Sequence, residues 1–180
     1  MRLLVVDDSR SSLALIGSIL TDMAAAEIDL CLSPRDGLER CAEQQYDLVV
    51  VDHVMPEMDG VAFTAALRGR TEYSLVPIIM VTSDAAKEIR IEAIRAGASD
   101  FLNKPFDPTE LQARVANLLA LRRAQVELAD RANWLAREVE RATAHLLARE
   151  EEVIWRLARA IEYRDGDTGG HVSRVAQISQ

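Results

Sequence analysis

Short apolar segments recur at regular intervals through the first hundred residues and constrain the fold more than any other feature. The runs are residues 2–6, 28–32, 47–51, 77–81 and 100–102. They lack the strict alternation of apolar and polar residues that is typical of a strand with one face in water. Strands that are covered on both faces are typical of parallel sheets. The sequence therefore predicts an α/β domain built on five parallel strands.

The segments between these runs have the composition of helices. They are Ser11 to Ala24, Pro34 to Gln44, Gly60 to Arg68 and Ala85 to Ala96. Gly97 directly follows the last of them, at a position where a glycine commonly ends a helix. Strands that alternate with helices through right-handed crossovers predict a doubly wound sheet with helices on both faces.

Charge and composition exclude several classes of partner. The formal net charge is −8, and the acidic excess lies in residues 1–121, so we expect no direct binding to nucleic acid. No apolar run approaches the roughly 20 residues that a bilayer span needs, so we expect a cytoplasmic protein with no membrane partner. Cys31 and Cys41 are the only cysteines, which does not indicate a disulfide framework.

The segment from Thr109 to Arg164 contains neither proline nor glycine and predicts one very long helix, or two. Mostly apolar residues recur in it at alternating steps of three and four: Leu118, Leu121, Gln125, Leu128, Ala132, Leu135, Val139, Ala142, Leu146, Arg149 and Val153. We call these residues the seam. Such a repeat favours a coiled coil and a homodimer, although a long helix packed on its own domain stays open.

Polar residues gather where the predicted strands end. Asp7 and Asp8 follow the first strand, Asp52 the third and Thr82 the fourth, while Lys104 follows the fifth. Ligands of open α/β sheets collect outside the carboxyl ends of the strands. Carboxylates that converge there repel one another unless a cation lies among them, and hard oxygen ligands suit Mg²⁺. The sequence therefore predicts a magnesium site.

A carboxylate beside a divalent cation and an ammonium group is suited to attack phosphorus, because both positive charges stabilise the oxygens of the transferred group. Asp52 is the predicted nucleophile, since it follows the central strand and has neutral neighbours. Lys104 supplies the ammonium group, and the Thr82 hydroxyl is placed to donate to a phosphoryl oxygen.

Four segments in this order, "VVDD", "VVVDHVMPEMDG", "IIMVTSDA" and "AGASDFLNKPFDP", resemble the flavodoxin-like receiver domain of bacterial two-component response regulators over about residues 1–121. The resemblance implies that Asp52 accepts a phosphoryl group from the phosphohistidine of a histidine kinase or phosphotransfer protein. It also implies that Asp7, Asp8, Asp52 and the backbone carbonyl of Val54 hold Mg²⁺.

The same resemblance assigns Lys104 to contact with the phosphoryl group and matches Thr82 and Phe101 to the switch pair of the family. It implies a cis bond between Lys104 and Pro105. Phe101 stands where many receivers have tyrosine, so the readout of the switch is expected to depend on packing alone.

Two other classes fit less well. A flavodoxin-like flavin-binding protein needs a phosphate-binding loop after the first strand, where Asp7 and Asp8 would repel the phosphate. A phosphatase of the haloacid dehalogenase kind needs a second acid two residues after its nucleophile, and Val54 occupies that position relative to Asp52.

The end of the sequence, "RDGDTGGHVSRV", resembles the first segment of HD-GYP domains, which hydrolyse cyclic di-GMP. The matching residues are Arg164, Asp165, Thr168, Gly169, His171, Arg174 and Val175. One histidine is not a metal site, so we expect no enzyme activity from these 180 residues. We expect a receiver (1–121), a helical coiled-coil linker (122–164) and the truncated start of an output domain (165–180). A diguanylate cyclase or DNA-binding output, or a stand-alone interaction scaffold, remains the alternative.

Overall fold

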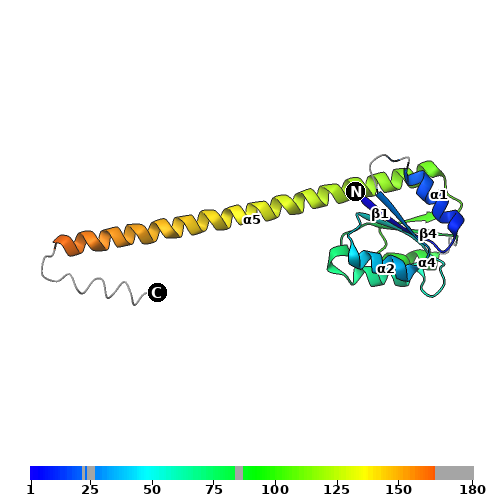
Figure 1. Cartoon of the computed structure of the whole chain (residues 1–180), viewed down its shortest axis with the longest axis horizontal. Helices are drawn as coiled ribbons and strands as arrows, with labels where there is room; N and C mark the ends of the chain where they lie inside the picture. Colours follow the sequence, from blue (N-terminus) through cyan, green and yellow to red (C-terminus); the bar gives the residue numbers. More distant parts are fainter. Residues whose placement is uncertain (22, 24–26, 84–86, 165–180) are drawn as a thin grey trace. The chain divides into compact units, whose positions relative to one another are not determined.

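The computed structural model describes residues 1–21, 23, 27–83 and 87–164 and distinguishes two units, Met1–Val126 and Glu127–Gln180 (Figure 1). The elements of the first unit, in chain order, are β1 (Arg2–Val6), α1 (Arg10–Thr21), β2 (Glu27–Cys31), α2 (Pro34–Glu43), β3 (Leu48–Asp52), α3 (Gly60–Arg68), a 3-10 turn η1 (Thr71–Tyr73), β4 (Ile78–Thr82), α4 (Lys87–Ala96) and β5 (Asp100–Asn103). Helix α5 (Pro108–Arg164) begins in this unit and continues through the second.

The five strands form one parallel sheet in the order β2-β1-β3-β4-β5, which confirms the predicted fold class. Three strands are displaced by one residue from their predicted positions. In particular, β3 and β4 include Asp52 and Thr82 as their last residues, because the strand pairing continues through Asp52–Val81 and Thr82–Asn103. Both polar residues are therefore held by the sheet itself and not by the loops that follow it.

Alternate strand residues pack into two separate apolar clusters, one on each face of the sheet. Leu3 and Val5 of β1 pack with α1 and the first turns of α5, whereas Leu4 and Val6 pack with α2 and α3. Figure 1 shows α1 and α2 on opposite sides of the strands. Both cysteines are buried and unpaired in the second cluster. The two-sided burial explains why the apolar runs lack alternation.

Local sequence signals set the helix boundaries. The Ser33 side chain caps α2, which has Pro34 in its first turn, and the Asp59 side chain accepts a hydrogen bond from Ala62 N at the start of α3. Gly97 has φ of 100°, a conformation that favours glycine, and follows α4 as predicted. Helix α1 ends at Thr21, earlier than predicted. Ala24, the predicted last residue of this helix, and Ala85, the predicted first residue of the helix before Gly97, lie outside the described residues.

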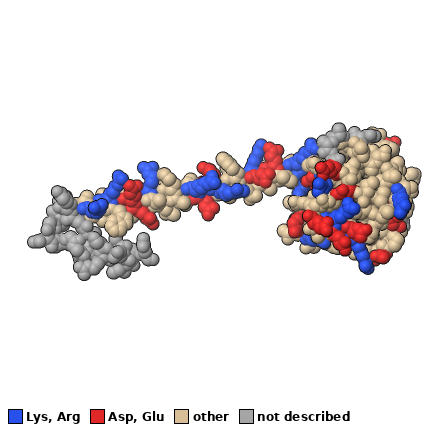
Figure 2. Space-filling view, in the orientation of Figure 1, with Lys and Arg blue, Asp and Glu red and all other residues tan. Residues whose placement is uncertain are grey.

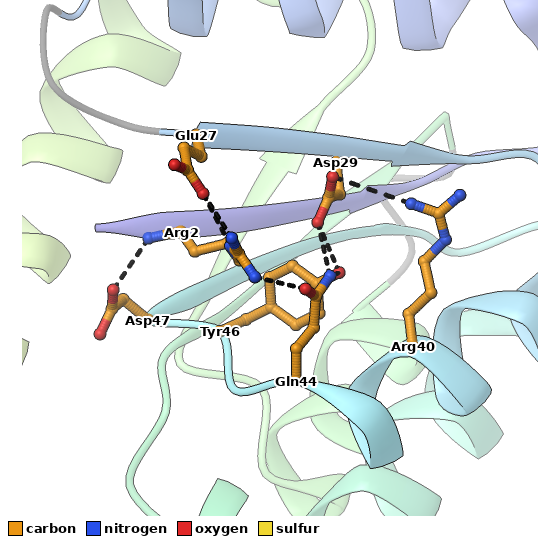
Figure 3. A network of polar contacts seen from close by, with 7 residues as sticks. All are labelled: Arg2, Glu27, Asp29, Arg40, Gln44, Tyr46 and Asp47. Atoms are coloured by element: carbon orange, nitrogen blue, oxygen red, sulfur yellow. Dashed lines mark hydrogen bonds and ion pairs between the residues drawn. The ribbon is translucent and has the colours of Figure 1, made fainter.

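A polar network holds β1, β2 and the segment before β3 together at the amino-terminal edge of the sheet (Figure 3). The Asp29 Oδ2 atom accepts hydrogen bonds from Tyr46 Oη and Gln44 Nε2, both at 2.7 Å. The guanidinium group of Arg2 binds the Glu27 carboxylate, with 2.9 Å between Nε and Oε2. Tyr46 is fully buried, and burial together with Asp29 raises the pKa of its hydroxyl to about 12.

The sequence predicts one very long helix or two, and the structure has one, because α5 is continuous over 57 residues. Its first turns are buried through Leu111, Val115 and Leu119. In the second unit the apolar seam residues are exposed: Leu128, Leu135, Val139, Leu146 and Val153 have exposed fractions of 54–65%. Acidic and basic side chains are interspersed along this part of the helix, with pairs such as Glu127–Arg131 and Glu152–Arg156 (Figure 2). Among the helices that the structure describes, none is both long and apolar enough to cross a bilayer.

Candidate functional site

Three carboxylates meet at the carboxyl-terminal edge of the sheet. Asp7 directly follows β1, Asp52 ends the neighbouring β3, and Asp8 extends from the β1–α1 loop. One oxygen from each of the three carboxylates lies within 4.8 Å of the others. Asp7 and Asp52 are buried, whereas Asp8 is exposed. The predicted convergence of these residues is therefore present in the structure, and one member of the cluster faces solvent.

Lys104 bridges the two buried carboxylates. Its Nζ atom lies 2.5 Å from Asp52 Oδ1 and 2.8 Å from Asp7 Oδ2. The backbone places the side chain there, because Lys104 N donates to Thr82 O at 2.7 Å. The bond between Lys104 and Pro105 is cis, as predicted. The ammonium group is thus the cation that offsets the charge of two acids with almost no access to water.

The ionisation behaviour of this cluster follows from burial and from the ion pairs. Burial raises the pKa of Asp52, and the neighbouring Asp7 adds to this effect, while the hydrogen bond from Lys104 opposes it. Burial disfavours the charged form of Lys104, but the hydrogen bonds to Asp52 and Asp7 outweigh that effect, and the pKa of Lys104 is raised. The raised pKa of Lys104 indicates that its ammonium group stays protonated beside the two acids.

Backbone contacts fix the orientation of the carboxylates. Asp52 Oδ2 accepts from Val54 N at 2.9 Å, and Asp7 Oδ1 accepts from Ser9 N at 2.8 Å. The turn from β3 into α3 passes so close to Asp52 that a Cβ atom at Gly60 would lie 2.4 Å from the Asp52 carbonyl oxygen. Gly60 was predicted only as the start of a helix, although its position at the end of "MPEMDG" is the signal that points to this close approach.

The switch candidates lie on adjacent strands. Thr82 ends β4 and is buried, while Phe101 lies in β5 opposite Met80 and is half-buried. The Arg90 guanidinium of α4 covers the Phe101 ring at 5.5 Å from its centroid, a distance at which a cation is attracted to an aromatic face. The ring therefore has a specific contact on α4, and no spacing in the sequence predicted it.

The donor set of the acidic cluster fits Mg²⁺. A carboxylate from each of Asp7, Asp8 and Asp52 gives hard oxygen ligands, and exposed Asp8 leaves one side open to water, which Mg²⁺ usually retains in its coordination shell. The backbone carbonyl of Val54 stays a predicted ligand.

Residues 3–116 match the family of the response regulator receiver domain, and the chain belongs to this family. The assignment agrees with the sheet order, with the three acids at the edge of the sheet and with Lys104 beside them. It confirms the receiver resemblance and disfavours the flavin-binding and dehalogenase-like alternatives.

Full-length similarity extends to two larger proteins. The cyclic di-GMP phosphodiesterase response regulator RpfG of Xanthomonas campestris pv. campestris is 36% identical over 180 residues, which cover 99% of this chain and 48% of that protein. A probable cyclic di-GMP phosphodiesterase of Vibrio cholerae is 30% identical over 96% of this chain and 39% of its own length. The chain thus spans less than half of either relative.

Solved structures show the same fold. The Vibrio cholerae chemotaxis protein CheY4 has a TM-score of 0.62 at 30% identity, over 65% of this chain and 97% of its own. A putative two-component response regulator with a GGDEF domain has a TM-score of 0.64 at 32% identity, over 68% of this chain and 50% of that one.

The residues from Asp165 to Val175 that resemble the first segment of HD-GYP domains lie outside the described part of the structure.

Proposed function

We propose that Asp52 is the phosphoacceptor of this receiver and that Asp7, Asp8, Asp52 and the Val54 carbonyl bind Mg²⁺. The observation that best supports this proposal is the placement of Lys104 Nζ at 2.5 Å from Asp52 and 2.8 Å from Asp7, within a cluster of three acids. A structural role alone does not require an exposed third carboxylate at the same edge. The donor of the phosphoryl group is a histidine kinase or a phosphotransfer protein.

In the proposed transfer, a carboxylate oxygen of Asp52 forms a bond to phosphorus while the bond between phosphorus and the donor histidine nitrogen breaks. The electron pair of that bond stays on the imidazole, which leaves in neutral form after it takes up a proton from solvent. Lys104 remains beside the incoming oxygens and stabilises their charge. Bound Mg²⁺ supplies the second positive charge. Asp7 and Asp8 hold their positions as ligands and form no bond to phosphorus.

Phosphorylation adds roughly 1.5 to 2 negative charges beside Thr82. The Thr82 hydroxyl turns toward the phosphoryl oxygens, and the space that it vacates accepts the Phe101 ring. Because Arg90 covers this ring at 5.5 Å, an inward turn of Phe101 removes a contact with α4. The face formed by α4, β5 and the start of α5 then changes shape, and this change is the proposed output signal.

The proposed domain order is a receiver at 1–121, a coiled-coil linker at 122–164 and the start of an HD-GYP output domain at 165–180. The relatives that match almost the whole chain bear the names of cyclic di-GMP phosphodiesterases, which supports this output. In a longer chain of this kind, the receiver would control hydrolysis of cyclic di-GMP. The 180 residues themselves act as the regulatory part and turn over no substrate.

The linker acts as a homodimerisation helix in this proposal. Within the linker, five large apolar seam residues of α5 are more than half exposed in a single chain, and a second copy would bury them. Gln125, Arg149 and the small residues Ala132 and Ala142 weaken the seam. A weak seam allows two arrangements of the paired helices whose free energies differ by a few kcal/mol. Phosphorylation of the receiver would favour one of them.

The proposal is tested by the intact mass of the chain after incubation with a small acyl phosphate and Mg²⁺. We expect one phosphoryl group for each wild-type chain and none in Asp52→Asn. Asp130→Asn makes the same isosteric change at an exposed position of α5 and serves as the matched control. Equal labelling of wild type and Asp52→Asn would exclude Asp52 as the acceptor.

A further inference from the structure

A polar pocket lies at the amino-terminal edge of the sheet, beside the starts of β4 and β5, whereas Asp52 lies at the carboxyl-terminal edge. It has a volume of about 280 Å³ and is enclosed by the end of α3, the segments that lead into β4 and β5, and α5 between Leu118 and Gln125. Leu75, Pro77 and Leu121 form its apolar part. The arginines Arg68 and Arg122, the hydroxyl groups of Ser74 and Ser99 and the amide of Gln125 form its polar part, and the lining includes no acidic residue.

Arg68 places an uncompensated positive charge in this pocket. Its guanidinium group donates to the carbonyl oxygens of Gly97 at 3.0 Å and Val76 at 2.7 Å, and also to Tyr73 O. No carboxylate in the described part of the chain pairs with it, and burial lowers its pKa. Half-buried cations are normally paired with an acid, and this one is not, in a protein with a net charge of −8.

Arg122 adds a second guanidinium group with unused capacity. Its Nε atom is buried and has no hydrogen-bond partner among the residues that the structure describes. Buried polar atoms without a partner are rare and costly. The next residue, Arg123, shows the contrast, because it is exposed and its Nε lies 3.0 Å from Met1 Sδ.

Ser99 supplies a donor to the same space. Its Oγ atom accepts from Ile78 N at 3.2 Å and from Arg68 Nη2 at 3.4 Å. Both lone pairs of the hydroxyl are thereby used, which leaves its proton for an acceptor in the pocket. The Ser74 hydroxyl differs, because its proton is donated to Thr71 O at 2.8 Å. The Ser99 hydroxyl and the Arg122 guanidinium group are therefore the donors that an anionic ligand would use in this pocket.

We propose that this pocket binds a small molecule that bears a phosphate group. The Arg122 guanidinium group matches the geometry of phosphate oxygens, and Ser99 donates a further hydrogen bond. Arg68 adds its positive charge and the one Nη2 N–H group that its contacts leave over. The apolar part at Leu75, Pro77 and Leu121 is suited to the remainder of an ester. A volume of 280 Å³ lies close to the lower end of small-molecule pockets, which is about 300 Å³.

Occupancy of the pocket would join α5 to the core of the receiver. Arg68 is fixed to the segments before β4 and β5, whereas Arg122 belongs to α5. A phosphate group bound by both arginines therefore stabilises the packing of α5 at the end of the receiver. This ligand would act on the same helix that carries the phosphorylation signal, from a site that does not include Asp52.

The test is isothermal titration of the full chain with phenyl phosphate and with inorganic phosphate, in chelator and without Mg²⁺. We expect one saturable site for each chain. Arg122→Gln should weaken it about tenfold, since a hydrogen bond to a charged group is lost. Arg123→Gln makes the same change one residue away and should bind as wild type does. Binding that persists in chelator, without the Mg²⁺ that the acidic cluster would hold, separates this pocket from the acidic cluster at Asp52.

The two ligands distinguish the source of the phosphate. Tighter binding of phenyl phosphate supports an ester as the ligand, and equal binding supports the free ion. Phenol should not bind. Circular dichroism and the thermal midpoint of the ligand-free variants show whether Arg122→Gln remains folded. Absence of saturable binding in the millimolar range overturns the proposal, as does equal weakening by Arg122→Gln and Arg123→Gln.

Discussion

The Nζ atom of Lys104 lies 2.5 Å from Oδ1 of Asp52, although the two residues are 52 positions apart in the sequence. The parallel sheet explains this contact, because β3 ends at Asp52 and Lys104 directly follows the end of β5 at the same edge. Without a metal ion, the ammonium group is the cation that stabilises Asp52 and Asp7 in the charged form. Lys104 and a divalent cation therefore act on the same carboxylates.

Replacement of Lys104 by glutamine should lower stability and tighten Mg²⁺ binding. The change leaves Asp7 and Asp52 without their counter-ion, and we expect a loss of about 3 kcal/mol in the free energy of unfolding in chelator. The metal then gains roughly tenfold in affinity, since no ammonium group competes for the carboxylates. Urea unfolding and calorimetric titration measure the two effects. With Arg123→Gln as control, an unchanged free energy of unfolding in Lys104→Gln would show that the ion pair is not stabilising.

The buried hydroxyl of Tyr46 should make the protein sensitive to alkali. Its pKa is raised from the ordinary value of 10.0 to about 12, so the folded state retains a proton that the unfolded state loses first. This contribution is complete below pH 10 and is lost as the pH rises from about 10 to 12, at up to about 1.4 kcal/mol per pH unit. Tyr46→Phe should flatten the decline of the free energy of unfolding over that window. Parallel curves for both proteins would count against this role of Tyr46.

Two adjacent leucines of α5 provide a matched test of dimerisation. Leu146 belongs to the seam and Leu147 does not, yet their exposed fractions of 64% and 57% are similar. Leu146→Glu should raise the dissociation constant of the dimer at least about tenfold, because a charge would be buried in the seam. Leu147→Glu should have little effect. Sedimentation equilibrium gives both dissociation constants. A monomeric wild type, or equal effects of the two changes, would contradict dimerisation through the seam.

The side chain of Val54 should prolong the life of the phosphoryl group. It is apolar, 61% exposed, and its backbone N–H is bonded to Asp52 Oδ2 at 2.9 Å. A water molecule that approaches Asp52 from this side meets a methyl group, so we expect the acyl phosphate to persist for at least minutes. Val54→Asn should shorten its lifetime, because an amide can orient the attacking water. Decay of the wild-type phosphoprotein within seconds would refute this prediction.

The sequence predicts the fold and the acidic cluster for the same physical reason. Apolar runs without alternation require a sheet that is covered on both faces, and the carboxyl ends of parallel strands meet at one edge. Asp7, Asp8, Asp52 and Lys104 all follow such runs, so their approach is predictable. The strand boundaries shift by one residue because backbone pairing continues to Asp52 and Thr82 regardless of side-chain polarity.

Other features depend on contacts between distant segments and leave little signal in the sequence. Asp7 and Asp8 form one motif, yet the first is buried and the second exposed. Arg68 is fixed by the carbonyl groups of three residues that lie apart in the sequence, Tyr73, Val76 and Gly97. Carbonyl groups exist at every residue, so no composition or spacing identifies the ones that bind an arginine. The pocket at Arg68 and Arg122 is for this reason a finding of the structure alone.

The central claim is that Asp52 forms an acyl phosphate beside Lys104 and Mg²⁺. Reduction of this acyl phosphate with borohydride, followed by peptide mapping, identifies the labelled residue directly. We predict that the reduced side chain appears at position 52 alone, only after treatment with both the phosphodonor and Mg²⁺. A label at Asp7 or Asp8, or a label at position 52 that forms equally well in chelator, would contradict the account.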